Sequence, residues 1–307
     1  MTQAAAGRLS VVIPARNAAA TLARSIASAR AQTMPPFEII VVDDASIDTT
    51  AAVARAAGGA LTRVLCLPVR QGAAAARNHG VEAARGDLVA FLDADDTWDP
   101  SKTARQIEVM VSQPATTFCA CRARHVAADG TLLGQIHQGV PVAQGPDAWR
   151  SLLAESFVAT PCVLARRDAI LDAGGFDPAL PVAEDQDLWI RLALAGGVGF
   201  VDDVLVTVHD RPGSLSQEYA SRTAEITLAM VLGHVERQKG RLTTAERRHA
   251  LGARYTQNGR RFYRNGQWRA GLRCLALAIL NGHQVGANAW YLVTAAPGMA
   301  RVKRWLG

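Results

Sequence analysis

Four carboxylates crowd into seven positions directly after an apolar run, in the stretch LVAFLDADDTWDP at residues 88–100. They are Asp93, Asp95, Asp96 and Asp99. Like charges at this spacing raise one another's pKa values unless a cation or hydrogen-bond donors hold them ionised. Carboxylate oxygens on a loop suit a hard divalent cation that also takes ligands from a diphosphate, as Mg²⁺ and Mn²⁺ commonly do. The stretch therefore predicts a divalent-metal site with a nucleotide diphosphate beside it.

The strands that would position these acids alternate with helices along the first hundred residues. Four aliphatic, β-branched runs predict buried strands over residues 9–15, 37–45, 61–69 and 86–96. The Ala-rich segments between them show helical spacing, and two of them end on glycine. This alternation predicts an α/β fold with a mostly parallel sheet, right-handed crossovers and helices on both faces.

Ligands of open parallel sheets bind beyond the carboxyl ends of the strands. The predicted strand ends carry residues 14–17, the pair Asp43 and Asp44, and residues 93–96. Three polar strand ends are therefore expected to meet in one crevice. The segment IPARNAAATL, which opens the first helix, has neither the dinucleotide-binding fingerprint nor a Walker lysine. The lack of both motifs argues against a dehydrogenase and against a P-loop enzyme.

The pattern after Pro100 is mixed. It predicts a hairpin that turns at residues 128–130, a short helix around Trp149, a strand and helix over 160–177, and an amphipathic helix over 184–197. From about residue 214 onward the pattern is helical, with breaks expected at Gly240, Gly266 and Gly282.

Six short motifs resemble those of inverting family 2 glycosyltransferases with the GT-A fold. In chain order they are VVIPARN, VVDDASIDTT, RQGAAAARNHG, FLDADD, GGFD and EDQDLWIRL. The resemblance covers roughly residues 8–215, and it is the order of all six motifs that makes it specific. It implies a GT-A domain over residues 1–213, Rossmann-like with a mostly parallel central sheet flanked by helices. A basic α-helical extension would follow over residues 214–307.

The resemblance also implies a role for each matching residue. The nucleotide-sugar donor would be bound by Pro14, Ala15, Asn17, Asp43, Asp44, Arg77 and Asp93. Within that set, Asp44 or Asp43 would accept hydrogen bonds from the base or ribose, and Arg77 would lie near the diphosphate. Asp185 would be the general base that takes the proton of the acceptor hydroxyl, with Glu184 beside it.

The resemblance implies a cofactor, Mn²⁺ or Mg²⁺, held by Asp95 and Asp93 with Asp96 adjacent. Family members often carry a histidine where this chain has Arg211, in the stretch HDRPGSLS. His209 precedes that position by two residues. Either His209 contacts the metal or diphosphate, or Arg211 supplies the positive charge.

The expected chemistry explains this division of labour. A hydroxyl attacks C1 of the sugar in line, so negative charge grows on the departing diphosphate while a proton leaves the nucleophile. The metal and Arg77 would stabilise the former, and a carboxylate on the opposite side would accept the latter. A single displacement inverts the anomeric centre. A UDP-sugar is the first expectation for the donor, and the acceptor is expected to be a glycan or a lipid-linked sugar in cell-envelope or exopolysaccharide assembly.

Structural explanations remain open for several of these residues. Asp44 and Asp48 also suit caps of the helix that follows them. Glu184, Asp185 and Asp187 also suit ordinary first-turn acids, which the helix dipole favours. A sugar nucleotidyltransferase and a non-catalytic nucleotide-sugar-binding or scaffold protein are the alternative functions. The first would need a glycine-rich loop after the first strand, which this sequence lacks.

The charge of the chain is unevenly distributed. The net charge is +6, yet residues 211–307 hold 16 Lys and Arg against 4 Glu, which leaves an acidic body of −6 and a basic tail of +12. The tail suits either a solvated helical face or attraction to anionic lipid headgroups or a lipid phosphate. No nucleic-acid recognition motif accompanies it. Without a secretory signal or a membrane-spanning apolar run, the expected location is the cytoplasm, with peripheral contact at the inner face of the membrane.

Overall fold

A computed structural model describes residues 7–136, 139–140, 142–210 and 222–294. The chain divides into two compact units. The first comprises Met1–Trp149 and Phe157–Ser214, and the second comprises Arg150–Ser156 and Leu215–Gly307. The domain boundary expected between residues 213 and 214 remains a prediction.

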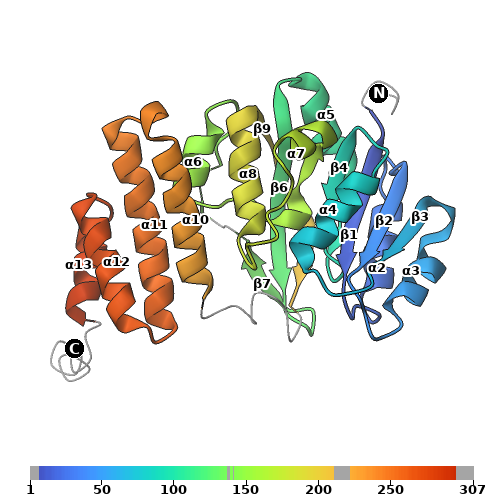
Figure 1. The fold of residues 1–307 in the computed structure, drawn as a ribbon, viewed down its shortest axis with the longest axis horizontal. Helices are drawn as coiled ribbons and strands as arrows, with labels where there is room; N and C mark the ends of the chain where they lie inside the picture. The colour runs from blue at the N-terminus through green and yellow to red at the C-terminus, as the bar shows by residue number, and fades with distance from the viewer. Residues whose placement is uncertain (1–6, 137–138, 141, 211–221, 295–307) are drawn as a thin grey trace. The chain divides into compact units, whose positions relative to one another are not determined.

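The described part of the first unit is built on a nine-stranded sheet (Figure 1). Its strands are β1 (Leu9–Ala15), β2 (Glu38–Asp43), β3 (Thr62–Cys66), β4 (Leu88–Phe91), β5 (Thr97–Trp98), β6 (Thr116–Val126), β7 (Leu132–Gln135), β8 (Leu164–Arg166) and β9 (Gly197–His209). Their order is β3-β2-β1-β4-β8-β6-β9-β5, and β7 pairs with β6. The first four strands pair in parallel as predicted, whereas β8 runs antiparallel to both β4 and β6.

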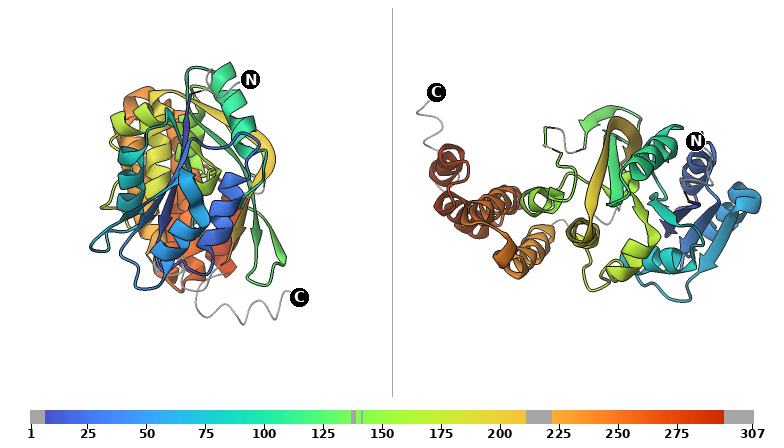
Figure 2. Two further views of the ribbon diagram at one scale, coloured as in Figure 1. Left: turned by 90° about the vertical axis from the view of Figure 1, so that its right-hand side faces the viewer. Right: turned by 90° about the horizontal axis from the view of Figure 1, so that it is seen from above.

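Helices cover both faces of this sheet. They are α2 (Leu22–Arg30), α3 (Thr50–Gly58), α4 (Ala73–Ala83), α5 (Lys102–Ser112), α7 (Arg167–Asp172) and α8 (Glu184–Ala195). In Figures 1 and 2, α4, α7 and α8 form a row on one face, while α2 and α5 lie on the other. Residues of α2, α3 and α5 share one apolar core with alternate residues of the sheet, such as Val11, Ile13 and Val41. This alternation is the period-2 pattern that a sheet covered on both faces requires.

The second core of the first unit is aromatic. The rings of Phe91, Phe118 and Phe176 surround Trp189 of α8 at centroid distances of 5.6–6.0 Å. Trp189 is fully buried. Gly80 brings α4 close to β1, because a Cβ atom there would lie 2.3 Å from Cγ1 of Val12. The helix that carries Arg77 is thus held tightly on the sheet.

The second unit is helical in its described part. Its helices are α10 (Thr223–Arg237), α11 (Thr244–Arg264), α12 (Trp268–Leu280) and α13 (Val285–Thr294), and it includes most of α6 (Ala148–Ala154). The breaks predicted at glycines 240, 266 and 282 are confirmed, since each lies between two helices. Thr243 and Glu246 form a capping box at the start of α11.

Arginine 254 joins two parts of this second unit that are far apart in sequence. It is buried on α11, and its guanidinium donates to the carbonyl oxygens of Leu152 and Leu153 near the end of α6. These carbonyls have no partner within a helix that ends there, so the arginine satisfies them. None of the helices in the described residues is both long enough and apolar enough to span a membrane.

The five cysteines are free. Four of them are buried, namely Cys119, Cys121, Cys162 and Cys274, whereas Cys66 is exposed. They pack as small apolar side chains in the cores of the two units.

Candidate active site

The carboxyl ends of β1 and β2 lie side by side and are joined by hydrogen bonds. The amide of Asp44 donates to the carbonyl of Ala15 at 2.8 Å, and the Asn17 side chain accepts from the amide of Ile47 at 3.0 Å. Asn17 has a left-handed backbone with φ of 47°, which asparagine tolerates better than most residues. Pro14 is half-buried and Ala15 is buried here. The structure therefore brings the predicted donor-binding residues of both strand ends together.

Both aspartates at the end of β2 are buried and accept hydrogen bonds from the backbone. Asp43 accepts from the amide of Ser46 at 3.0 Å. The two Asp44 oxygens accept from the amides of Gln71 and Gly72, at 2.7 and 2.9 Å. Asp44 therefore fixes the entry to α4 rather than capping the helix that follows it in sequence. Asp48 accepts from the amide of Thr50, the first residue of α3, at 2.9 Å, but the N-cap residue of that helix is Thr49 rather than Asp48.

Arg77 lies between the acids of β4 and α8. It is buried on α4, and its guanidinium donates to Asp93 at 2.9 Å and to Glu184 at 2.7 Å. The guanidinium also lies over the ring of Phe176, 5.4 Å from its centroid. Burial alone would lower the pKa of Arg77, but the neighbouring carboxylates of Asp93 and Glu184 raise it above its usual range. The arginine is thus a fixed positive charge that links the two predicted acidic clusters.

The two acids that begin α8 have different surroundings. Burial and the charge of Asp185 raise the pKa of Glu184, and Arg77 opposes that rise. Asp185 accepts from the hydroxyl of Thr160 at 2.8 Å through Oδ2 and from the amide of Gln186 at 2.7 Å through Oδ1. The hydroxyl is buried with Thr160, so water cannot readily replace it. The Asp185 carboxylate is therefore held in one orientation.

The third acid of this turn has a structural role. Asp187 pairs with Arg191 one turn later at 2.6 Å, and that arginine also donates to the carbonyl oxygens of Ala173 and Gly175. The group fixes the loop between α7 and α8. The first-turn explanation therefore holds for Asp187, while Glu184 and Asp185 have longer-range partners.

The turn after β4 contains a buried carboxyl group with a strongly raised pKa. Asp96 is 3% exposed and accepts from the backbone amide of His209 at 3.1 Å. Burial, together with the charges of Asp93 and Asp95, raises the pKa of Asp96 to about 9. A cation bound to this cluster would offset the repulsion that raises it.

His209 ends β9 beside this turn. Its Nε2 lies 3.3 Å from the hydroxyl of Thr97. Burial and the nearby guanidinium groups of Arg24 and Arg124 lower its pKa, which favours the neutral imidazole that metals bind. The structure thus brings His209 to the acidic turn. Arg211, the other candidate for this position, lies outside the described residues.

Within the described ranges, no cluster of three or more His, Cys, Asp or Glu side chains is already arranged around a common point. The donors nevertheless fit a hard cation in their chemistry, because the carboxylates of Asp93 and Asp95 lie on one turn and, after burial, their negative charges raise the pKa of Asp96. Asp93 keeps 29% of its side chain exposed, whereas Asp96 is buried.

A contact between two motifs explains the second glycine of GGFD. The side chain of Asn78, next to Arg77, donates to the carbonyl of Phe176 and accepts from its amide, both at 2.8 Å. Gly175 has φ of +71°, and a Cβ atom there would lie 2.6 Å from Oδ1 of Asn78. Glycine is therefore required for α4 and this loop to meet.

Sequence reasoning missed two residues of the site. Thr160 lies in a short 3-10 turn with no motif around it, and only the fold brings it to Asp185. Arg24 of α2 donates to the backbone carbonyl of Asp95 at 2.8 Å. Its position on the outer face of an Ala-rich helix is indistinguishable in sequence from that of a solvent-exposed arginine.

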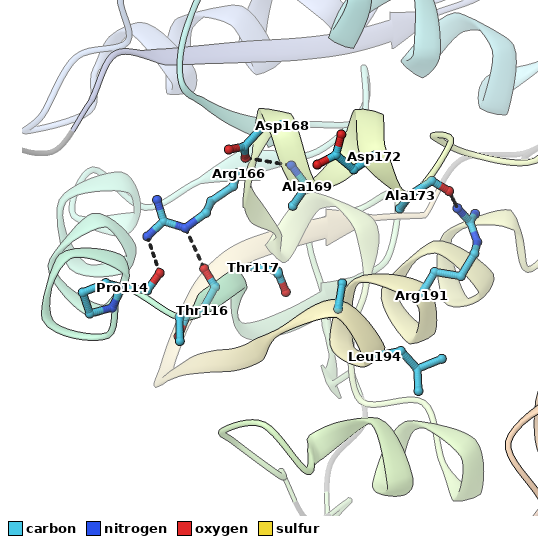
Figure 3. Close-up of a pocket in the computed structure, with 12 residues that line it drawn as sticks. Pro114, Thr116, Thr117, Arg166, Asp168, Ala169, Asp172, Ala173, Arg191 and Leu194 are labelled. Carbon is cyan, nitrogen blue, oxygen red and sulfur yellow. Dashed lines mark hydrogen bonds between the residues drawn. The ribbon is translucent and has the colours of Figure 1, made fainter. Parts of the chain in front are cut away.

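A pocket of about 640 Å³ lies apart from these residues (Figure 3). It is lined by the start of β6, by α7 and by the last turn of α8. Two arginines of its lining donate to backbone carbonyls, Arg166 to those of Thr116 and Pro114 and Arg191 to that of Ala173. None of the predicted site residues lines it.

Comparison with known proteins identifies the family. Residues 10–174 match the model of glycosyl transferase family 2, which is more than half of the chain, and the chain belongs to that family. This membership argues against the nucleotidyltransferase alternative.

Two curated relatives are similar over part of their length. The succinoglycan biosynthesis protein ExoU of Rhizobium meliloti is 34% identical over 65% of this chain and 60% of its own length. WfgD of Escherichia coli, a UDP-Glc:alpha-D-GlcNAc-diphosphoundecaprenol beta-1,3-glucosyltransferase, is 36% identical over 34% of this chain and 41% of its own. The chain thus spans less than two thirds of the length of these relatives.

Solved structures share the fold. S. aureus TarS 1-349 in complex with UDP-GlcNAc superimposes with a TM-score of 0.69 at 19% identity, over 89% of this chain and 81% of that one. The mannosyltransferase PcManGT of Pyrobaculum calidifontis, in complex with GDP-Man and Mn²⁺, gives 0.62 at 19% identity, over 94% and 79%. The predicted GT-A fold, a mostly parallel sheet flanked by helices with further helices at the C-terminus, is confirmed.

Proposed function

We propose that the chain is an inverting glycosyltransferase that moves a sugar from a nucleoside-diphosphate sugar to an acceptor hydroxyl. One observation carries the proposal. Arg77 donates to Asp93 of the acidic turn and to Glu184, the neighbour of Asp185. Donor-side and acceptor-side carboxylates therefore belong to a single network, which a transfer between two bound substrates requires.

The donor occupies the corner formed by the ends of β1, β2 and β4 in this proposal. Asp43 and Asp44, together with Asn17, line the base and ribose region, and Pro14 and Ala15 form its floor. Arg77 and Arg24 supply positive charge where the diphosphate departs. The complexes of family-fold neighbours with UDP-GlcNAc and GDP-Man support a nucleotide-sugar donor, with UDP as the first candidate base.

Asp93 and Asp95 would hold a divalent ion, Mn²⁺ or Mg²⁺, with His209 as a further ligand and Asp96 as their neighbour. When bound, the ion neutralises charge that develops on the leaving diphosphate. The Mn²⁺ complex of PcManGT supports this cofactor.

Asp185 acts as the general base toward the acceptor hydroxyl. A base must have its lone pairs aimed at the proton it removes. The hydroxyl of Thr160 and the amide of Gln186 support this role, because they hold the carboxylate in one orientation. Glu184 serves indirectly, because it anchors Arg77 beside the donor.

The acceptor is a glycan or a lipid-linked sugar of an exopolysaccharide or cell-envelope pathway. The names of ExoU and WfgD support this setting, since the first concerns succinoglycan biosynthesis and the second an undecaprenol-linked sugar. Conversely, a non-catalytic binding protein would not need a buried network that orients Asp185.

Calorimetric titration with UDP, GDP, dTDP and CDP, each with and without Mn²⁺, tests the proposal. We expect one nucleotide to bind with Mn²⁺ and to bind at least tenfold more weakly without it. Asp95→Asn should abolish this dependence on metal. Metal-independent binding, or no binding of any nucleotide, would contradict the assignment of the acidic turn.

A further inference from the structure

The last three described helices hold an unusual balance of charge. Residues 247–294 contain eight arginines and no aspartate or glutamate. One of the eight, Arg254, is buried and donates to α6. The other seven lie at or near the surface of the second unit. Arg247 pairs with Glu236 of α10 at 3.3 Å. No carboxylate within residues 247–294 offsets the charge of the other arginines, so this surface is positive.

Apolar side chains accompany these arginines on α12. The inward side of this helix buries Gly271, Cys274, Leu275 and Ala278. The opposite side forms what we call the α12 stripe, which consists of Trp268, Arg269, Leu272, Arg273, Ile279 and Leu280. These positions fall within less than half a turn of an ideal helix.

The stripe leaves apolar surface in contact with solvent. Trp268 is 37% exposed and Leu280 is 73% exposed. Val285, at the start of α13, is 47% exposed. The guanidinium of Arg269 lies over the ring of Trp268 at 5.0 Å, so the charged and aromatic groups form one patch. A solvent-exposed helix face with no binding partner would not be expected to combine several arginines, exposed apolar side chains and an arginine stacked on tryptophan.

We propose that the α12 stripe binds the surface of an anionic lipid bilayer. Arginines attract anionic headgroups, while tryptophan and leucine insert at the boundary with the acyl chains. The long arginine side chains reach the headgroups while their stems remain against apolar surface. A soluble polyanion would be attracted by the same charges but would gain nothing from Leu280.

Cosedimentation with vesicles tests this proposal without any substrate, so its outcome is independent of the proposed transferase activity. The full chain should bind vesicles made of phosphatidylglycerol and phosphatidylcholine, and added salt should dissociate it from them. It should not bind vesicles of phosphatidylcholine alone. Each arginine near an anionic surface contributes about 1 kcal/mol, so the double variant Arg269→Gln and Arg273→Gln should bind about 30-fold more weakly.

A matched control removes the same charge elsewhere. Arg237 and Lys239 are exposed near the end of α10, and their double change to glutamine also lowers the charge by two. It should reduce binding several-fold less than the α12 variant. Equal loss in both variants would overturn the assignment to α12 and leave only a general effect of charge.

A substitution of Leu280 distinguishes binding to a membrane from binding to a soluble polyanion. Because this side chain is 73% exposed, Leu280→Ser should leave the thermal unfolding transition unchanged. It should nevertheless weaken vesicle binding by roughly tenfold, because an inserted leucine is lost. Unchanged vesicle binding in this variant, or equal binding of a polyuridine RNA and the anionic vesicles by the wild type, would overturn the proposal.

Discussion

Single residues of the site differ in function according to what their side chains contact. Asp187 fixes a loop through Arg191, and Glu184 anchors Arg77. Asp185 is instead oriented by a buried hydroxyl from another part of the chain. The sequence EDQD does not distinguish the three acids. Only their contacts in the structure show which of them have structural partners and which one is oriented as the proposed base would be.

Thr160 provides a test of that difference. Thr160→Val keeps the shape of the side chain but removes the donor to Asp185, which leaves the carboxylate free to rotate. A hydrogen bond to a charged group is worth about 1.5–3 kcal/mol, so we expect kcat to fall roughly 10- to 100-fold. The KM for the donor should change little, and Thr160→Ser should restore most of the rate.

The control for this variant is another buried threonine. Thr117 donates to the carbonyl oxygens of Leu192 and Gly197 away from the site. Thr117→Val loses a buried hydroxyl as well, yet it should leave kcat within a few fold of the wild type. A similar loss of kcat in both variants would mean that Thr160 acts through stability alone.

Asp96 makes the stability of the metal-free protein depend on pH. The folded protein keeps the Asp96 proton up to about pH 9, whereas an unfolded aspartate loses it near pH 4. Unfolding therefore releases a proton in this window, and the free energy of unfolding falls as pH rises through it. Asp96→Asn removes this dependence.

We expect Asp96→Asn to be more stable than the wild type by roughly 1–3 kcal/mol at pH 8.5 in the absence of metal, with a smaller difference at pH 5. Urea unfolding at both values measures it. Asp172→Asn, at an exposed position on α7, serves as the control and should show no such change. Parallel loss of stability with pH in the wild type and Asp96→Asn would contradict the raised pKa.

At the scale of elements, the loop between α7 and α8 sets the distance between the helix of Arg77 and the helix of Asp185. Gly174 and Gly175 both have positive φ, but only Gly175 has a neighbour within 4 Å in the Cβ direction. That neighbour is Asn78 of α4, which holds Phe176. The two glycines therefore differ in what a methyl group would disturb.

Changing each glycine to alanine separates backbone strain from helix contact. Gly174→Ala should cost about 1–2 kcal/mol, the usual penalty for a left-handed residue. Gly175→Ala should cost about 1–2 kcal/mol more and should also lower kcat, because Asn78 must move and Arg77 follows it. Urea unfolding and donor turnover measure the two effects. Equal behaviour of the two variants would remove the role assigned to the contact with Asn78.

The sequence predicted most of these elements correctly, because their patterns are local. The four parallel strands, the hairpin at residues 128–130 and the glycine breaks of the second unit follow from period, β-branching and turn residues. Long-range contacts carry no such signal. The bond of Thr160 to Asp185 and the grouping of residues 150–156 with the second unit depend on packing between distant segments.

At the scale of the whole molecule, charge and chemistry are distributed between different parts of the chain. The first 210 residues are acidic and carry the proposed donor-binding and base residues, while the remainder carries a charge of +12. The motifs of the first part were sufficient to predict the family, because six of them occur in order. No motif predicted the α12 stripe, because it depends on which side of a helix is left exposed.

Asp95 and Asp185 are proposed to act on opposite sides of one transfer reaction. Hydrolysis of the nucleotide sugar in the presence of Mn²⁺ tests this proposal most directly, because water replaces the acceptor. The variants Asp95→Asn and Asp185→Asn should be compared for nucleotide binding and for hydrolysis.

We predict that Asp185→Asn binds nucleotide as the wild type does and hydrolyses the donor 10²- to 10⁴-fold more slowly, the usual range for loss of a general base. Asp95→Asn should lose metal-dependent binding and hydrolysis together. Hydrolysis at the wild-type rate by Asp185→Asn would contradict the assignment of Asp185 as the general base.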